Sequence, residues 1–200
     1  MKNSFLKIIF LTYILLSTAC SISPVKPETL DTQKSYADFT GINVNVGSLA
    51  PDFSLPNAQG QLVSLRDHQN KDAVLLLFYR GEWCPYCMDQ LDNYQALLPE
   101  LEKHNIQLIA ISPDPVASLQ NTKRRFGQNY IFLSDVNLQA TNKYGIGNEK
   151  NLPHPSLFLI DKKGILKWYY ASTDHKVRPT ADQVESIIRK VFSKNSTTMD

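Results

Sequence analysis

Two cysteines, Cys84 and Cys87, are separated by two residues in the segment YRGEWCPYC, residues 79–87. Such a pair can cycle between a dithiol and a disulfide, supply two ligands to a metal ion, or form a short structural bridge. A bridge that closes so short a loop contributes little stability. A zinc site needs four ligands, and the sequence has neither a second Cys-x-x-Cys nor a closely spaced histidine pair. We therefore favour redox chemistry over a structural bridge or a metal site.

The segments on either side of the pair indicate where each thiol lies. A continuous apolar run at residues 73–78 predicts a central strand covered on both faces, and apolar residues at helical spacing follow the cysteines. Cys84 is then expected at a helix N-terminus, where free N–H groups and the helix dipole favour a thiolate. We predict that Cys84 is the nucleophile and that Cys87, one turn later, resolves the mixed disulfide. Pro85 suits the first helical turn, where a missing N–H costs nothing.

The remaining elements alternate along the chain. Asp114 is expected to cap a helix that ends near Gly127, and Thr180 with Gln183 matches a capping box before a last helix. Further strands are predicted at residues 106–112, 130–134, 156–161 and 165–171, a short helix at 137–144, and an early hairpin from 53–55 and 61–65. This order predicts an α/β fold, a mixed central sheet with helices on both faces and an N-terminal β-hairpin extension.

The third cysteine, Cys20, ends an N-terminal segment that has the layout of a secretory signal. Lys2 and Lys7 are followed by an apolar run at residues 8–16 and then by small residues. The sequence LSTAC resembles a bacterial lipoprotein processing box, in which the cysteine is lipidated and becomes the new N-terminus. A plain cleaved signal and an uncleaved anchor are the alternatives. We expect an exported protein, anchored to a membrane on its periplasmic or cell-surface side.

Composition limits the class of protein further. A chain of 200 residues with 42% hydrophobic residues is long enough for one globular domain, and three cysteines are too few for a disulfide-stapled mini-protein. Removal of the signal would take away two lysines and lower the formal charge from +2 to 0, which argues against a nucleic-acid partner. The predicted divisions are a signal peptide at 1–19, a polar tether at 20–45, the domain at 46–194 and a tail at 195–200.

Five segments in this order carry a resemblance to a known family: GSLAPDFSLPNAQGQLVSL, FYRGEWCPYC, ISPD, FLSD and SLFLIDKKG. They resemble the peroxiredoxin-like branch of the thioredoxin-like superfamily, which includes alkyl hydroperoxide reductases, thiol-specific antioxidants and redoxins. The resemblance implies a thioredoxin-like fold with extra N-terminal strands.

Peroxiredoxins and disulfide reductases of this superfamily carry different residues at the same positions. In peroxiredoxins the family register puts the peroxidatic cysteine at Cys87, a threonine at Cys84 and an arginine at Pro155. Thioredoxin-like disulfide reductases instead carry WC-x-x-C and a cis-proline that faces the pair. Trp83, Cys84, Cys87 and Pro155 match that second pattern.

Thioredoxins also hold a buried acid beneath the pair, and Phe78 occupies its place here. Proton transfer at Cys87 would then depend on Glu82, another group or water. Arg80 could favour a thiolate by its charge or could be a solvated surface residue.

The resulting prediction is a thiol-disulfide oxidoreductase without a cofactor or metal, which acts on protein thiols or disulfides. The first alternative is a peroxiredoxin-like thiol peroxidase that reduces hydroperoxides. A third is a redox-sensitive metal-binding module of the copper-chaperone kind, which would need another soft ligand beside the two thiolates.

Overall fold

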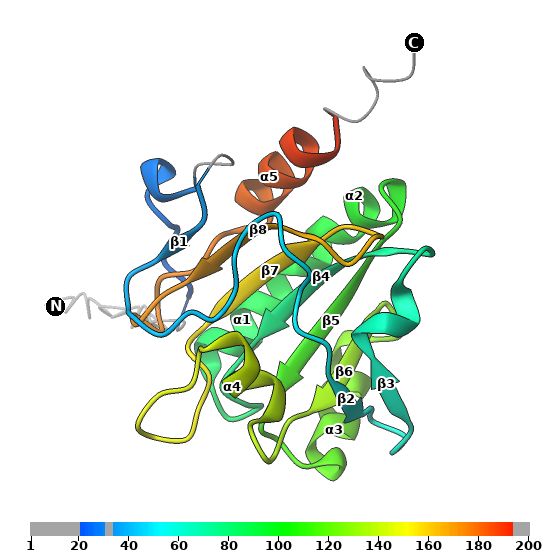
Figure 1. Ribbon diagram of the computed structural model, residues 1–200. Helices are drawn as coiled ribbons and strands as arrows, with labels where there is room; N and C mark the ends of the chain where they lie inside the picture. Colours follow the sequence, from blue (N-terminus) through cyan, green and yellow to red (C-terminus); the bar gives the residue numbers. More distant parts are fainter. Residues whose placement is uncertain (1–20, 31–33, 194–200) are drawn as a thin grey trace, which may run out of the picture.

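The computed structural model describes residues 21–30 and 34–193 (Figure 1). The α-helices are α1 (Pro85–Asn93), α2 (Leu98–Lys103), α3 (Val116–Phe126), α4 (Gln139–Tyr144) and α5 (Ala181–Ser193). The strands are β1 (Tyr36–Ala37), β2 (Ser54–Pro56), β3 (Leu62–Ser64), β4 (Ala73–Phe78), β5 (Ile106–Ser112), β6 (Tyr130–Ser134), β7 (Ser156–Ile160) and β8 (Leu166–Ala171). Three short 3₁₀ helices are η1 (Pro27–Thr29), η2 (Leu65–His68) and η3 (Tyr94–Leu97).

One mixed sheet organises the molecule, with strand order β1-β8-β7-β4-β5-β6 (Figure 1). Strand β4 pairs in parallel with β5 and antiparallel with β7, and all six of its residues are buried. Because both faces of β4 are covered, its sequence is continuously apolar rather than alternating. The predicted hairpin is also present, as β2 and β3 pair antiparallel in a separate small sheet.

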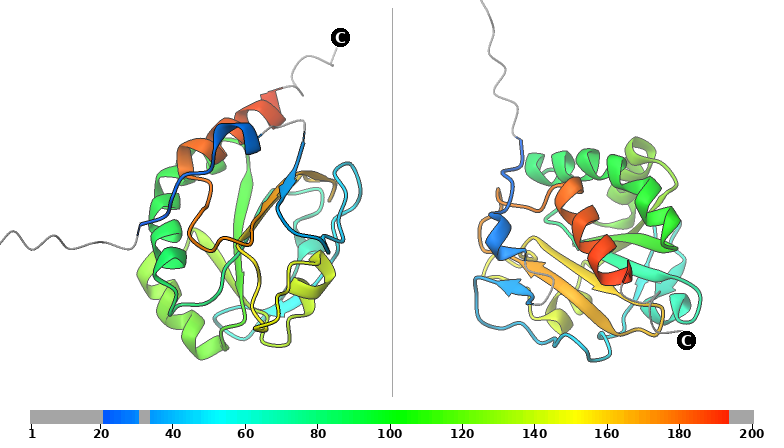
Figure 2. Two further views of the ribbon diagram at one scale, coloured as in Figure 1. Left: turned by 90° about the vertical axis from the view of Figure 1, so that its left-hand side faces the viewer. Right: turned by 90° about the horizontal axis from the view of Figure 1, so that it is seen from above.

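Alternate residues of the central strand belong to two separate hydrophobic clusters, as the two-residue period of a strand requires. Leu75 and Leu77 pack with apolar residues of α1, α2, α3 and α5. Val74 and Leu76 pack on the opposite face with α4 and the β2–β3 hairpin. Figure 2 shows the helices on both sides of the sheet, which confirms the predicted architecture.

Two helix boundaries differ in detail from the prediction. Asp114 does not cap α3, because Pro115 holds the N-cap position and the Asp114 carboxylate bonds elsewhere. The helix that follows the cysteines is divided at η3 into α1 and α2, and Pro99 lies in the first turn of α2. By contrast, the capping box is confirmed: the Thr180 N–H donates to Gln183 Oε1 at 3.0 Å and the Gln183 N–H to Thr180 Oγ1 at 3.4 Å.

Much of the segment predicted as a polar tether packs on the domain. Val25 and Leu30 are buried in the cluster that contains α5, and β1 pairs in parallel with β8 at the edge of the sheet. The Ile22 N–H donates to Asp89 Oδ2 on α1 at 2.6 Å. A few apolar side chains among polar residues are enough to hold this segment, which lies beside α5 in Figure 2.

The predicted signal peptide, Cys20 and the C-terminal tail at 195–200 lie outside the described residues. Within the described ranges, no helix combines the length and apolar character needed to cross a membrane.

Candidate active site

Cys84 lies at the junction between the central strand and α1. It is the N-cap residue, with φ −88° and ψ 110°, and Pro85 begins the helix as predicted. The Cys84 carbonyl accepts hydrogen bonds from the N–H groups of Cys87 at 3.0 Å and Met88 at 3.1 Å. Both thiols are free and buried, with 1% of Cys84 and 0% of Cys87 exposed.

The Asp114 carboxylate holds the loop of residues 79–83 in place. Its carboxylate accepts hydrogen bonds from the Glu82 N–H at 2.9 Å and from the Ser112 hydroxyl at 2.9 Å. Gly81 has φ +140°, and a Cβ there would lie 2.6 Å from Trp83 Nε1 and 2.8 Å from Asp114 Oδ1. Only glycine fits this approach, so the loop presents Cys84 in one defined position.

Arg178, in the loop between β8 and α5, directly contacts the second thiol. The Arg178 side chain is fully buried, and its Nη2 donates to Cys87 Sγ at 3.3 Å. Its Nη1 donates to Gln90 Oε1 at 2.6 Å, and its Nε donates to the His175 carbonyl at 3.1 Å. The structure therefore places a guanidinium against Cys87, the thiol whose proton transfer the sequence analysis assigned to Glu82, another group or water.

The electrostatics separate the roles of the two sulfurs. A hydrogen bond from the Cys87 thiol, together with the Cys87 N–H and the charges of Arg178 and Arg80, lowers the pKa of Cys84 to about 6 despite its burial. Burial, and the donation of its own proton to Cys84, raise the pKa of the Cys87 thiol, although Arg178 opposes this. At neutral pH, the resting pair is thus a Cys84 thiolate hydrogen-bonded by a Cys87 thiol.

This assignment predicts the pH dependence of alkylation. We expect the rate of iodoacetamide modification of Cys84 to be half-maximal near pH 6, because its pKa is about 6 and the thiolate is the reacting form. The rate should fall below that pH and stay flat from pH 7 to pH 9, where an ordinary thiol of pKa ~8.5 still gains reactivity. Peptide mass spectrometry assigns the label to each cysteine. Faster labelling of Cys87, or a midpoint near 8.5, would contradict the assignment.

Three other predicted residues lie around the pair. Trp83 is 57% exposed, and the guanidinium carbon of Arg80 lies 5.0 Å from the centre of the Trp83 ring. Glu82 contributes its backbone N–H to Asp114. Arg80 thus acts on Cys84 through its charge while it packs against an exposed aromatic surface.

A groove of about 290 Å³ borders this region, lined by Arg80, Asn148, Glu149, Lys150, Pro153, His154, Pro155, Thr173 and His175. The His175 ring makes an edge contact with Tyr86, between the two cysteines, with centroids 5.5 Å apart. The groove and the α1 N-terminus therefore form one surface, and Pro155 is part of it.

The cis-proline expectation was wrong. The described residues contain no cis peptide bond, so the bond before Pro155 is trans. The trans form is favoured by ~0.5–1 kcal/mol at an X–Pro bond unless the surroundings demand the other. Here Pro155 directly precedes β7, and its carbonyl accepts a hydrogen bond from the Ser172 N–H at 3.2 Å. It is a strand-entry proline, which needs no N–H donor at that place.

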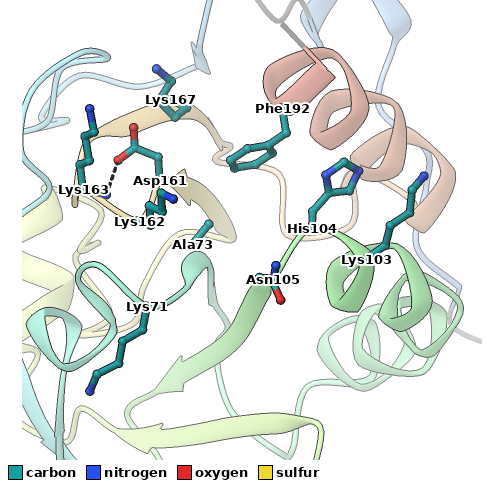
Figure 3. Close-up of a pocket in the computed structure, with 10 residues that line it drawn as sticks. All are labelled: Lys71, Ala73, Lys103, His104, Asn105, Asp161, Lys162, Lys163, Lys167 and Phe192. Carbon is teal, nitrogen blue, oxygen red and sulfur yellow. Dashed lines mark hydrogen bonds between the residues drawn. The ribbon is translucent and has the colours of Figure 1, made fainter. Parts of the chain in front are cut away.

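A larger cavity, of about 600 Å³, lies at the opposite end of the sheet, where β4 and β5 begin (Figure 3). Five lysines line it and point in different directions, and the lining includes no cysteine, serine or threonine (Figure 3). Neither there nor elsewhere in residues 21–30 and 34–193 do three or more His, Cys, Asp or Glu side chains gather as a metal site would require.

Sequence reasoning assigned neither Arg178 nor Gln90 to the site, and it named Asp114 only as a helix cap. Arg178 is 91 residues from Cys87 in the chain and belongs to no recognisable spacing. Its one local signal is the capping box at Thr180, which places it just before the last helix.

Several known proteins resemble the part of the chain that carries the Cys84–Cys87 pair. Residues 46–169 match the family described as the AhpC/TSA family. The chain is 34% identical over 125 residues to the thiol-disulfide oxidoreductase ResA of Geobacillus thermodenitrificans, with 62% of this chain and 68% of the relative covered. It is 34% identical to the putative peroxiredoxin bcp of Helicobacter pylori, with 62% and 86% covered.

A solved structure gives the same architecture. The reduced 2-Cys peroxiredoxin of Plasmodium vivax matches with a TM-score of 0.67 at 20% identity, over 76% of this chain and 99% of the other. This likeness establishes a thioredoxin-like fold.

Proposed function

The chain belongs to the AhpC/TSA family of thiol-based oxidoreductases, and from this premise we propose that it exchanges electrons with protein thiols or disulfides through the Cys84–Cys87 couple. One observation carries the proposal. The sulfur with the lowered pKa is Cys84, and Cys87 serves as its hydrogen-bond donor. Disulfide exchange needs this arrangement: one cysteine is a thiolate that acts as the nucleophile, and the other is a neighbouring protonated thiol that resolves the mixed disulfide.

The reaction proceeds in two displacements. The Cys84 thiolate attacks one sulfur of a substrate disulfide, which forms a mixed disulfide and releases the other sulfur as a thiolate that takes up a proton. Cys87 then loses its proton and attacks the Cys84 sulfur, which releases the second substrate thiolate. The substrate gains two electrons, and the Cys84–Cys87 pair becomes a disulfide that an external dithiol must reduce. Run in reverse, the same steps oxidise a substrate dithiol.

The surroundings of the pair suit a polypeptide substrate. Trp83 offers an exposed aromatic surface beside Cys84, and aromatic side chains are frequent anchors at protein interfaces. The groove lined by Arg80, Pro155 and His175 continues from that surface. A substrate segment lying there would bring its disulfide to the N-terminus of α1.

A thiol peroxidase is the second candidate, and one contact favours it. Arg178 donates to Cys87, the cysteine at the peroxidatic position of the family register. A fixed cation beside a sulfur would also stabilise charge that develops on a peroxide oxygen.

Single-turnover kinetics of the reduced protein distinguish the two activities. We expect the protein to reduce an insulin disulfide at least about tenfold faster than it reduces hydrogen peroxide at equal concentration, because the thiolate is at Cys84. Protein alkylated at both cysteines is the control for background reduction. Rapid consumption of micromolar peroxide with no reduction of the protein disulfide would reject the proposal and favour the peroxidase.

We further propose that the protein is exported and carries a lipid on Cys20. The support is the charged, apolar and small-residue order of its first 20 residues, a sequence pattern typical of lipoprotein signals. The protein would then meet its substrates outside the cytosol, where disulfides persist.

A further inference from the structure

Arg178 is a buried cation, and none of the three groups to which its side chain donates a hydrogen bond carries a permanent charge. Its two neutral partners are the Gln90 side chain and the His175 carbonyl, and its third is Cys87 Sγ. None of the ion pairs among the described residues includes Arg178. A buried guanidinium without an anion is strongly disfavoured, so the pair of sulfurs is the place where compensating charge is expected.

Two carboxylates on the neighbouring segments make hydrogen bonds to backbone groups and form no ion pair with Arg178. Asp89, on the helix that carries Cys87, accepts from the Ile22 N–H. Asp174, on the loop that carries Arg178, accepts from the Lys176 N–H. The Cys84 thiolate, which lies next to the Cys87 sulfur that Arg178 contacts, is the anion whose charge this cation stabilises.

The loop that carries Arg178 is held from several sides. The Arg178 N–H donates to the Ser23 carbonyl at 3.0 Å, and Ser23 forms a parallel bridge with Val177. The Nε contact to the His175 carbonyl closes the loop on itself. Backbone and side-chain contacts therefore both hold the guanidinium beside Cys87.

We propose that Arg178 is a catalytic residue of the pair, which stabilises the reduced, negatively charged dithiol and thereby makes the Cys84–Cys87 disulfide a stronger oxidant. This inference rests on the proposed dithiol-disulfide function. Oxidation converts one thiolate and one thiol into a disulfide, with the release of one proton and two electrons. The negative charge beside Arg178 is lost in that step, so a fixed cation favours the reduced side of the equilibrium.

The same contact acts on the resolving step. Cys87 must give up its proton before it attacks the mixed disulfide, and charge then develops on the sulfur that Nη2 already contacts. A preorganised donor lowers the cost of that charge without any rearrangement.

The test is the equilibrium between the protein and a glutathione redox buffer, read as the fraction of the Cys84–Cys87 disulfide by mass spectrometry. We expect Arg178→Gln to shift the equilibrium constant at least about tenfold toward the disulfide, which equals about 30 mV in a two-electron couple. The pH midpoint of Cys84 alkylation should rise in the same variant. Arg66→Gln is the matched control, because Arg66 is an exposed arginine that pairs with Asp52; it should change neither value.

Arg178→Lys keeps the charge but loses the planar fork, so a shift in the same direction but smaller is expected. If Arg178→Gln fails to fold, the equilibrium constant and alkylation midpoint of Arg178→Lys test the proposal instead. A folded variant with an unchanged equilibrium constant and alkylation midpoint would overturn the proposal, because a purely structural role moves neither. If the wild-type protein forms no Cys84–Cys87 disulfide in any buffer, the proposed function itself fails, and that result is distinguishable from an unchanged constant.

Discussion

The Cys87→Ala protein is expected to accumulate a mixed disulfide through Cys84 and to lose at least about 100-fold in multiple-turnover disulfide exchange. The first displacement needs only the Cys84 thiolate, which remains. The second is intramolecular in the wild type, and an external thiol cannot match the effective concentration of a neighbouring group. Mass spectrometry of the protein after exposure to an insulin disulfide measures the adduct directly.

Cys87→Ser is the matched variant, since a serine hydroxyl can still donate a hydrogen bond to the Cys84 sulfur. We expect it to form the adduct faster than Cys87→Ala, because the donation from residue 87 is the first cause of the low Cys84 pKa. Cys84→Ala should form no adduct. Full turnover by Cys87→Ala, or an adduct on Cys87 in the Cys84→Ala protein, would refute the assigned roles.

The main sheet was predictable because its strands are long and apolar. The runs at 73–78, 106–112 and 130–134 coincide with β4, β5 and β6. Strands buried on both faces carry their signal in every residue, and turns or helices separate them clearly. The position of Cys84 at the start of α1 followed from the same reasoning.

Elements that depend on distant contacts were less predictable. Asp114 precedes a proline and a helix, which is a local capping pattern, yet its carboxylate bonds the Glu82 N–H, 32 residues away. Strand β1 has only two residues, too few for any periodicity. Its pairing with β8 depends on the sheet edge that the rest of the chain builds.

The chemical site shows the same division. The spacing of Cys84 and Cys87 is a local property, so the pair could be identified from the sequence alone. Arg178 reaches Cys87 from the loop between β8 and α5, and the nearby capping box predicts where α5 begins but not this contact. The conformation of Pro155 likewise depends on its neighbours in space, since its carbonyl accepts a hydrogen bond from the N–H of Ser172, which directly follows β8.

Cys20→Ala is expected to abolish lipid attachment completely and to move the protein from the membrane fraction to the aqueous phase. In the proposed lipoprotein the Cys20 sulfur is the lipid acceptor, so alanine leaves no acceptor. Each buried methylene contributes ~0.8 kcal/mol to membrane binding, so the loss of acyl chains has a large effect on partitioning. Metabolic labelling with a fatty acid and phase separation in detergent measure both results. Acyl chains on the variant would show that the lipoprotein prediction is wrong.

The redox pair should be unaffected by this substitution, which makes the result interpretable. In the part of the chain that the structure describes, the Ile22 N–H donates to Asp89 and Ser23 forms a bridge with Val177, and neither contact uses the Cys20 side chain. A Cys20→Ala protein should therefore keep a Cys84 alkylation midpoint near pH 6, as its pKa of about 6 requires. The Cys84→Ala, Cys87→Ala double variant is the reciprocal control, because it retains Cys20 and should stay lipidated. If lipid and redox activity were lost together in Cys20→Ala, the first 20 residues would have to act on the pair itself, and the separation of anchor and site would be refuted.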